Sequence, residues 1–314
     1  MATNRFCIGR LEIDHLSDDL LVCIFKLYRL EFDYYHDPWP WLALVHVCKR
    51  WRRIIFAWPH HIDVQLNCES GTAVTRALEV WPNLPVSIRS RFDYLNNSGD
   101  LIAALEHRDS IVGIDFSVGL SGPQLERYAS LMQGPFPFLR TLFLDCYSEN
   151  PPAMTDALLG GSAPRLQKLR LCRVPFPTLP KLLLSAHDLV ELHLEYSATT
   201  GYISSDVMAT CLSVLPRLQY LGIIFQSTEP ILQVRTDACL LPPTRAHLPA
   251  LATLVLIGVR EYSEDLISGI DAPLLRYLQI SFLYQPIFDI PQLSRLINGT
   301  EKLKSPVFAS IDFH

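Results

Sequence analysis

One short pattern of apolar positions recurs through the last two thirds of the chain, with leucine or isoleucine at its first, fourth and sixth places. Five copies read Pro-x-Leu-x-x-Leu-x-[Leu/Ile] and begin at Pro137, Pro164, Pro216, Pro249 and Pro273. A sixth copy begins at Leu189 without the proline, and a weaker one begins at Ile111. Successive copies are 23 to 33 residues apart. A period of that size is typical of stacked supersecondary units.

In the last places of each copy, apolar residues alternate with residues of other kinds, and this alternation predicts a strand with one buried face. Proline suits the start of such a strand, because no ladder donor is lost there. Helical patterns separate the copies at Gln124–Met132, Leu179–Leu184, Asp206–Leu215, Glu264–Ile270 and Gln292–Asn298. Alternating strands and helices predict a parallel sheet with right-handed crossovers. Two earlier strands, Ile62–Leu66 and Val86–Arg91, with a helix over Thr72–Trp81 between them, extend this prediction toward the N-terminus.

Two amphipathic helices are predicted before the repeats, over residues 16 to 29 and 41 to 57. Ser17 is a suitable N-cap for the first helix, whose apolar positions 20, 21, 24 and 25 form one face. The second has apolar positions 44, 48, 51 and 55 and a basic flank, and Pro59 ends it. Two helices this short cannot bury so much apolar surface between themselves, so the pattern predicts a partner.

At these residues the chain resembles the F-box. The family pattern runs through a Leu-Leu-x-x-Ile-Phe helix, matched by Leu20 to Phe25, and a Val-Cys-[Lys/Arg]-x-Trp-[Arg/Lys] helix, matched by Val47 to Arg52. The resemblance covers about residues 13 to 58. Ser17 stands where the family has proline, and residues 31 to 40 lengthen the connection between the helices. This acidic and aromatic insertion is similar to that of F-box proteins from fungi of the mushroom group.

The resemblance implies a partner and a set of contact residues. The partner is a Skp-type adaptor, which would connect the chain to a cullin scaffold. The implied adaptor-binding residues are Leu16, Ser17, Leu20, Leu21, Ile24, Phe25, Val47, Cys48 and Trp51. Within this set we expect Trp51 to hold the two helices together.

The repeats resemble leucine-rich repeats, most strongly over residues 105 to 312. The ninth consensus position, usually Asn or Cys, holds Tyr147, Val174 and Ser197 in three copies. We therefore expect an irregular, open arc. The predicted fold class is α/β: an all-helical F-box followed by an irregular right-handed α/β solenoid with a parallel sheet on its concave face. The expected domains are a tail over 1–12, the F-box over 13–58 and the substrate-binding solenoid over 59–314.

A β/α barrel is the competing fold, since it also alternates strands and helices. Barrel strands are buried on both faces and read as continuous apolar runs. Here the alternating positions include Lys168 and Arg170 on one strand and Glu191, His193 and Glu195 on another. A charged strand face needs water or a partner, which favours the open arc.

That alternating face is the predicted substrate surface. The third, fifth and seventh places of each copy line it, and the candidates among them are Phe143, Lys168, Arg170, Glu191, His193, Glu195, Tyr220 and Tyr277. Such a mixture of charges and aromatic rings could dock a protein segment of mixed charge. The alternative is that Lys168 pairs with Glu191, and Arg170 with Glu195 or His193, as ordinary cross-strand pairs.

Composition narrows the function classes. A net charge of −5 and a pI near 6.0 argue against nucleic acid as a partner, and no apolar stretch approaches the roughly 18 residues of a membrane helix. The N-terminus does not resemble a secretory signal. Eight scattered cysteines lack metal-ligand spacing, so they indicate a reducing compartment, cytoplasmic or nuclear, and no metal or cofactor is predicted.

No catalytic motif is present, so we do not expect an enzyme. The predicted function is the substrate-recognition subunit of a Skp-cullin-F-box ubiquitin ligase. The alternative is a leucine-rich-repeat interaction scaffold that uses the two helices only as an apolar end cap. The sequence ends soon after the apolar residues Val307, Phe308 and Ile311, which suggests a shortened chain whose last unit is incompletely covered.

Overall fold

A computed structural model describes residues 13–30, 41–58, 66–68, 76, 79, 84–89, 98–197, 202–226, 245–282, 290–299 and 309–313. The chain divides into two compact units, one of residues 1–67 with 76–86 and one of residues 68–75 with 87–314. Several predictions lie outside the described residues: the tail over 1–12, the insertion at 31–40, most of the strand at 62–66, the helix over 72–81 apart from residues 76 and 79, and the exposure of Val307, Phe308 and Ile311 near the C-terminus.

The first unit contains the predicted helix pair, with one correction. A short 3-10 helix η1 (Ile13–His15) precedes α1 (Asp18–Leu30), and Leu20 N donates to Ser17 Oγ at 3.3 Å, which confirms Ser17 as the N-cap. The second predicted helix is two helices, α2 (Leu42–Val45) and α3 (Lys49–Ala57). The break occurs because Cys48 is extended and serves as the N-cap of α3: its Sγ accepts from Trp51 N at 3.5 Å.

The repeat leucines mark the strands correctly. The strands of the main sheet are β1 (Leu66–Cys68), β2 (Val86–Arg89), β3 (Ile111–Leu120), β4 (Thr141–Cys146), β5 (Lys168–Cys172), β6 (Glu191–Tyr196), β7 (Tyr220–Phe225), β9 (Thr253–Gly258), β11 (Tyr277–Phe282) and β12 (Ala309–Phe313). In the six copies whose first leucine is at position 139 or later, the strand starts two residues after that leucine. That leucine is buried in the turn that leads into the strand.

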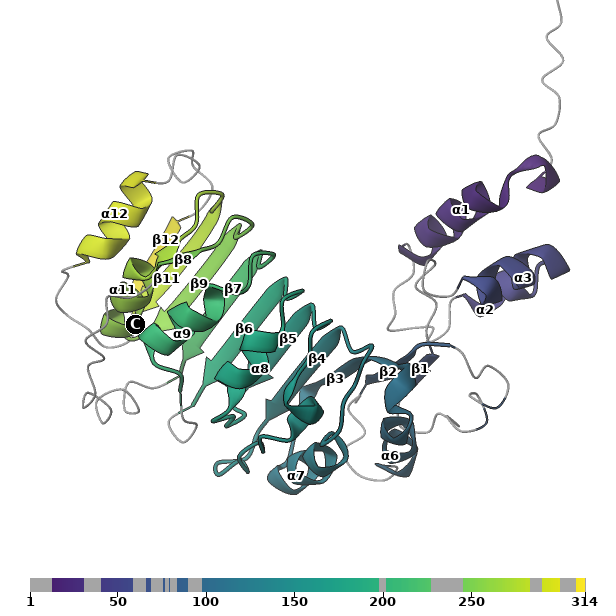
Figure 1. Ribbon diagram of the computed structural model, residues 1–314, viewed down its shortest axis with the longest axis horizontal. Helices are drawn as coiled ribbons and strands as arrows, with labels where there is room; N and C mark the ends of the chain where they lie inside the picture. Colours follow the sequence, from purple (N-terminus) through teal and green to yellow (C-terminus); the bar gives the residue numbers. More distant parts are fainter. Residues whose placement is uncertain are drawn as a thin grey trace, which may run out of the picture. The chain divides into compact units, whose positions relative to one another are not determined.

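The main sheet has the order β1-β2-β3-β4-β5-β6-β7-β9-β11-β12, and the strands from β3 onward pair in parallel. Figure 1 shows these strands side by side in chain order. The described sheet is open, with β1 and β12 at its two edges, so the barrel alternative is wrong. A small second sheet pairs β8 (Ala246–His247) with β10 (Ile270–Asp271).

Helices connect the strands and cover the leucine side of the sheet. They are α6 (Ser98–Glu106), α7 (Gly122–Leu131), α8 (Leu179–Ser185), α9 (Ser205–Leu212), α11 (Arg260–Ser268) and α12 (Pro291–Gly299), with 3-10 helices η2 (Arg108–Ser110) and η3 (Leu158–Gly161). Neighbouring helices pack in chain order, α8 on α9, α9 on α11 and α11 on α12. The α/β class with a parallel sheet is confirmed. The prediction for α11 was four residues late, since the polar turn at Arg260 conceals its start.

The strand leucines form the core beneath this helix layer. Every leucine or isoleucine at the fourth and sixth places, from Leu142 to Ile280, is at most 3% exposed. The sequence therefore assigned the buried face of the sheet correctly. Among the helices that the structure describes, none combines the length and the apolar character needed to cross a membrane.

Candidate functional site

The helical unit exposes one apolar stripe along α1. Leu20, Ile24 and Leu27, spaced i, i+4 and i+7, are 53%, 42% and 64% exposed. Val47, in the turn that leads into α3, is 58% exposed, and Ile13 of η1 is 54% exposed. Large apolar side chains exposed at one helical spacing form a candidate contact surface, because covering each of them would be favourable.

A second apolar stripe on α1 forms the interior of the helical unit. Leu21 and Phe25 are fully buried, as is Ile55 of α3. The ring of Trp51 lies 4.8 Å from that of Phe25, and so joins α3 to α1. Leu21 and Phe25 were predicted to contact an adaptor, but the structure does not place them on the surface. They shape the helix pair, and Leu20 and Ile24 remain accessible.

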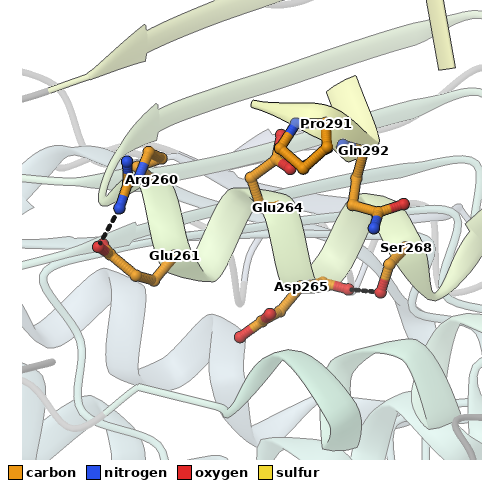
Figure 2. A pocket seen from close by; sticks show the side chains of 7 residues that line it. All are labelled: Arg260, Glu261, Glu264, Asp265, Ser268, Pro291 and Gln292. Atoms are coloured by element: carbon orange, nitrogen blue, oxygen red, sulfur yellow. Dashed lines mark hydrogen bonds and ion pairs between the residues drawn. The ribbon is translucent and has the colours of Figure 1, made fainter. Parts of the chain in front are cut away.

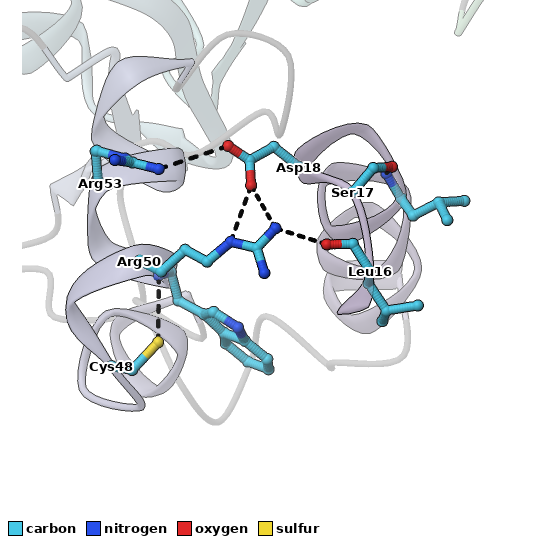
Figure 3. Close-up of polar contacts among 8 residues, drawn as sticks. Leu16, Ser17, Asp18, Cys48, Arg50 and Arg53 are labelled. Atoms are coloured by element: carbon cyan, nitrogen blue, oxygen red, sulfur yellow. Dashed lines mark hydrogen bonds and ion pairs between the residues drawn. The ribbon is translucent and has the colours of Figure 1, made fainter. Parts of the chain in front are cut away.

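Polar contacts hold the two helices in register (Figure 3). Arg50 donates through Nε and Nη2 to Asp18 Oδ1, at 3.0 and 2.7 Å, and through Nη2 to the carbonyl oxygen of Leu16 at 2.6 Å. Arg53 Nη2 lies 3.7 Å from Asp18 Oδ2. Thus the Leu16–Ser17 segment is fixed by its backbone and its cap, with the Leu16 side chain half-buried and Ser17 exposed.

The second candidate surface is the face of the main sheet opposite the helices, here called the open face. Strand register aligns its residues in three rows that cross β4, β5, β6, β7, β9 and β11. The third-place row is Thr141, Lys168, Glu191, Tyr220, Thr253 and Tyr277. The fifth-place row is Phe143, Arg170, His193, Gly222, Val255 and Gln279. The seventh-place row is Asp145, Cys172, Glu195, Ile224, Ile257 and Ser281.

The eight predicted substrate-facing residues all lie in these rows, seven of them half-buried and Arg170 exposed. The alternative of cross-strand pairing holds for one pair: Lys168 Nζ lies 2.5 Å from Glu191 Oε1. For Arg170 it holds in register only: Arg170 lies opposite His193, but its Nε is 3.4 Å from Cys172 Sγ on its own strand. Phe143, Tyr220 and Tyr277 add aromatic surface to the same rows.

Arg173, which the sequence analysis missed, organises the seventh-place row. It follows β5 directly in a left-handed conformation, with φ of 57°. Its Nη2 lies 2.5 Å from Asp145 Oδ1 and its Nη1 3.2 Å from Glu195 Oε1, so it neutralises carboxylates on the strands at either side. Its Nε donates to the carbonyl oxygen of Cys146 at 3.1 Å. The available signal was acids at the seventh place of both flanking copies.

Cys172, His193 and Glu195 converge beside Arg173. One sulfur, nitrogen or oxygen atom of each lies within 4.8 Å of the other two, and this is the one such group in the described part of the chain. His193 Nδ1 is 3.4 Å from the Tyr220 hydroxyl. His193 Nε2 is buried and has no hydrogen-bond partner among the described residues.

Burial and neighbouring charges shift the pKa values in this cluster. Burial raises the pKa of Cys172 to about 11, with the nearby Arg170 opposing the shift. Burial lowers the pKa of His193, and the positive charge of Arg170 lowers it further. Burial also raises the pKa of Asp145, and this effect outweighs the attraction of Arg173. Cys172 is therefore a thiol and His193 a neutral imidazole at pH 7.

The α11–α12 pocket, of about 370 Å³, lies in the second unit (Figure 2) and is lined by Arg260, Glu261, Glu264, Asp265, Ser268, Pro291 and Gln292. The Glu264 carboxylate accepts from Gln292 N at 2.8 Å and from Leu293 N at 3.0 Å. Those donors belong to the first turn of α12, whose amides lack partners within the helix. Glu264 therefore caps α12, and we assign this pocket a structural role.

Comparison with known proteins adds no family assignment, because no protein-family model matches the chain and no curated protein matches it significantly.

Proposed function

We propose that this chain is an F-box protein that acts as the substrate-recognition subunit of a Skp-cullin-F-box ubiquitin ligase. The observation that carries the proposal is the division of α1 into two apolar stripes. One stripe, Leu21 and Phe25, is fully buried within the helical unit, whereas the other, Leu20, Ile24 and Leu27, is exposed. The exposed stripe takes no part in the interior of the helical unit, so it remains for a contact outside that unit.

The sequence pattern gives this surface its partner. Leu20-Leu21-x-x-Ile24-Phe25 and Val47-Cys48-Lys49-Arg50-Trp51-Arg52 resemble the F-box, so the occupant is a Skp-type adaptor that brings a cullin scaffold. Direct contact is assigned to Leu16, Ser17, Leu20, Ile24, Val47 and Cys48. The buried Leu21 and Phe25 support these contacts from beneath, and Trp51 ties the helices together.

The second unit would hold the target. The alternation of strands and helices, together with parallel pairing in chain order, supports a leucine-rich-repeat-like solenoid whose exposed sheet face binds protein. The open face offers the rings of Phe143, Tyr220 and Tyr277 beside charged groups. The chain itself needs no catalytic residue, since tethering a target near a conjugating enzyme raises its effective concentration. Such a receptor would act in the cytoplasm, the nucleus or both.

A binding assay with purified Skp-type adaptor tests the proposal. We expect micromolar or tighter binding by the wild type and a loss of at least about 100-fold in the double variant Leu20→Asp, Ile24→Asp. Two contacts are lost and two carboxylates must be desolvated, which together exceed about 2.7 kcal/mol. Lys26→Asp is the matched control, since Lys26 is exposed on α1 away from the stripe.

Equal binding by the wild type and the double variant would refute the adaptor site. A folded wild type that does not bind the adaptor would favour the scaffold alternative.

A further inference from the structure

Cys172, His193 and Glu195 combine three kinds of metal-binding group on two neighbouring strands. Parallel register places Cys172 opposite Glu195, and His193 precedes Glu195 by two residues on the same face of β6. Their ligand atoms all lie within 4.8 Å of one another. Ligand atoms around a tetrahedral zinc ion are about 3.2–3.8 Å apart, so side-chain adjustments of about 1 Å would complete the geometry.

The two ring nitrogens of His193 have different surroundings. His193 Nε2 is buried without a hydrogen-bond partner in the described structure, and a buried polar atom without a partner is destabilising. The other nitrogen, Nδ1, lies 3.4 Å from the Tyr220 hydroxyl. A metal-binding histidine characteristically donates its second ring N–H to an oxygen, which fixes the tautomer. Tyr220 would serve as that acceptor.

The carboxylate keeps one oxygen available. Arg173 Nη1 and Gln226 Nε2 both donate to Glu195 Oε1, at 3.2 and 2.5 Å. Glu195 Oε2 has no hydrogen-bond partner among the described residues. The two donors on Oε1 therefore hold the carboxylate in place without occupying the oxygen that a cation would need.

We propose that Cys172, His193 and Glu195 bind one Zn²⁺ ion, with a fourth coordination position directed toward the open face. Thiolate and imidazole ligands favour zinc over Mg²⁺ or Ca²⁺. Coordination replaces the thiol proton, which leaves to solvent. The thiolate and the carboxylate supply two negative charges to the ion, and the carboxylate shares its charge with Arg173. This inference is independent of adaptor binding.

Two arginines next to the site, Arg170 and Arg173, should affect zinc binding differently. Arg173 is neutralised by Asp145 and Glu195, and it stays in place as a support. Arg170 instead directs Nε at Cys172 Sγ, 3.4 Å away, from an exposed position. It must swing away when the ion binds. Removing its charge in Arg170→Gln should therefore tighten zinc binding, by about tenfold for a charge some 5 Å from a divalent ion.

The experiment is a titration of the purified full chain with Zn²⁺ against a chromophoric chelator, under reducing conditions. We expect one ion per chain, and affinity at least about tenfold weaker in both Cys172→Ser and His193→Gln. The matched controls are Cys211→Ser, a buried cysteine in α9, and His187→Gln, an exposed histidine, and both should bind as the wild type does. Circular dichroism establishes that each variant is folded.

Cobalt(II) supplies a measurement that needs no variant. Bound to the wild type, it should give a near-ultraviolet thiolate charge-transfer band and the intense visible bands of a four-coordinate ion. Three results would each overturn the site. They are no zinc binding up to about 100 µM, unchanged zinc affinity in folded Cys172→Ser or His193→Gln, and a cobalt spectrum without the thiolate band.

Discussion

Replacement of Arg173 should destabilise the second unit by more than the loss of an ordinary surface ion pair would. The side chains of Arg173, Asp145 and Glu195 are only 21%, 13% and 17% exposed. Arg173→Ala leaves two carboxylates facing each other without their shared cation. Breaking a buried pair in this way costs about 3–5 kcal/mol, and the residual exposure here lowers the expected loss to about 2–4 kcal/mol.

The left-handed backbone of Arg173 also predicts how the alanine and glycine variants should differ in stability. At φ of 57°, any residue with a Cβ atom is strained by about 1–2 kcal/mol, whereas glycine is not. Arg173→Gly removes the same ionic contacts but relieves this strain. We therefore expect Arg173→Gly to be more stable than Arg173→Ala by about 1 kcal/mol, the reverse of the order found within helices.

Urea unfolding followed by circular dichroism measures these differences at pH 7. Arg217→Ala is the control: Arg217 also forms an ion pair, at 2.6 Å to Asp188, but the two side chains are 66% and 40% exposed. Its loss should stay within about 0.5 kcal/mol. The reasoning is refuted if Arg173→Ala loses no more than this control. It is also refuted if Arg173→Gly is the less stable of the two variants.

Three further predictions concern other parts of the fold. Arg50→Ala should cost the helical unit about 1–2 kcal/mol through lost donors to Asp18 and Leu16, measured as an earlier thermal transition in Trp fluorescence. Glu264→Ala should cost about 1 kcal/mol and speed hydrogen exchange at the first amides of α12; unchanged exchange would contradict the cap. The Tyr262 hydroxyl is buried without a partner among the described residues, and burial raises its pKa well above 10. Tyr262→Phe should therefore not lower stability at pH 7. Above about pH 10 only the unfolded tyrosine ionises, so the wild type should lose stability faster than Tyr262→Phe.

The sheet could be predicted because its information is local. Apolar residues at the fourth and sixth places face the core in every copy, and in the six copies from Leu139 onward the strand starts two residues after the first leucine. Helix boundaries were less accurate, because polar first turns such as that at Arg260 carry no apolar signal. The break at Cys48 was missed for a similar reason: apolar spacing continues through it, and only the extended backbone reveals it.

The cluster at the seventh-place row was missed because it depends on residues about one repeat apart. Metal-ligand searches use spacings of a few residues, whereas parallel register brings Cys172 beside Glu195, one 23-residue repeat later. Those two positions could have been paired from the repeat itself. For Arg173 the repeat offered only an indirect signal, the acids at the seventh place of both flanking copies, because Arg173 itself lies outside the repeat pattern.

The two stripes of α1 show that apolar spacing identifies the apolar side of a helix but does not tell which of its residues are buried. Residues 20, 21, 24 and 25 read as one apolar face, which is what any core helix presents. Packing divides that face: Leu21 and Phe25 are enclosed with Ile55 and Trp51, while Leu20 and Ile24 continue outward to Leu27. A helix that needed only to complete its own unit would be polar at these three positions. Because they are leucine and isoleucine, the exposed stripe is not explained by the packing of the helical unit alone.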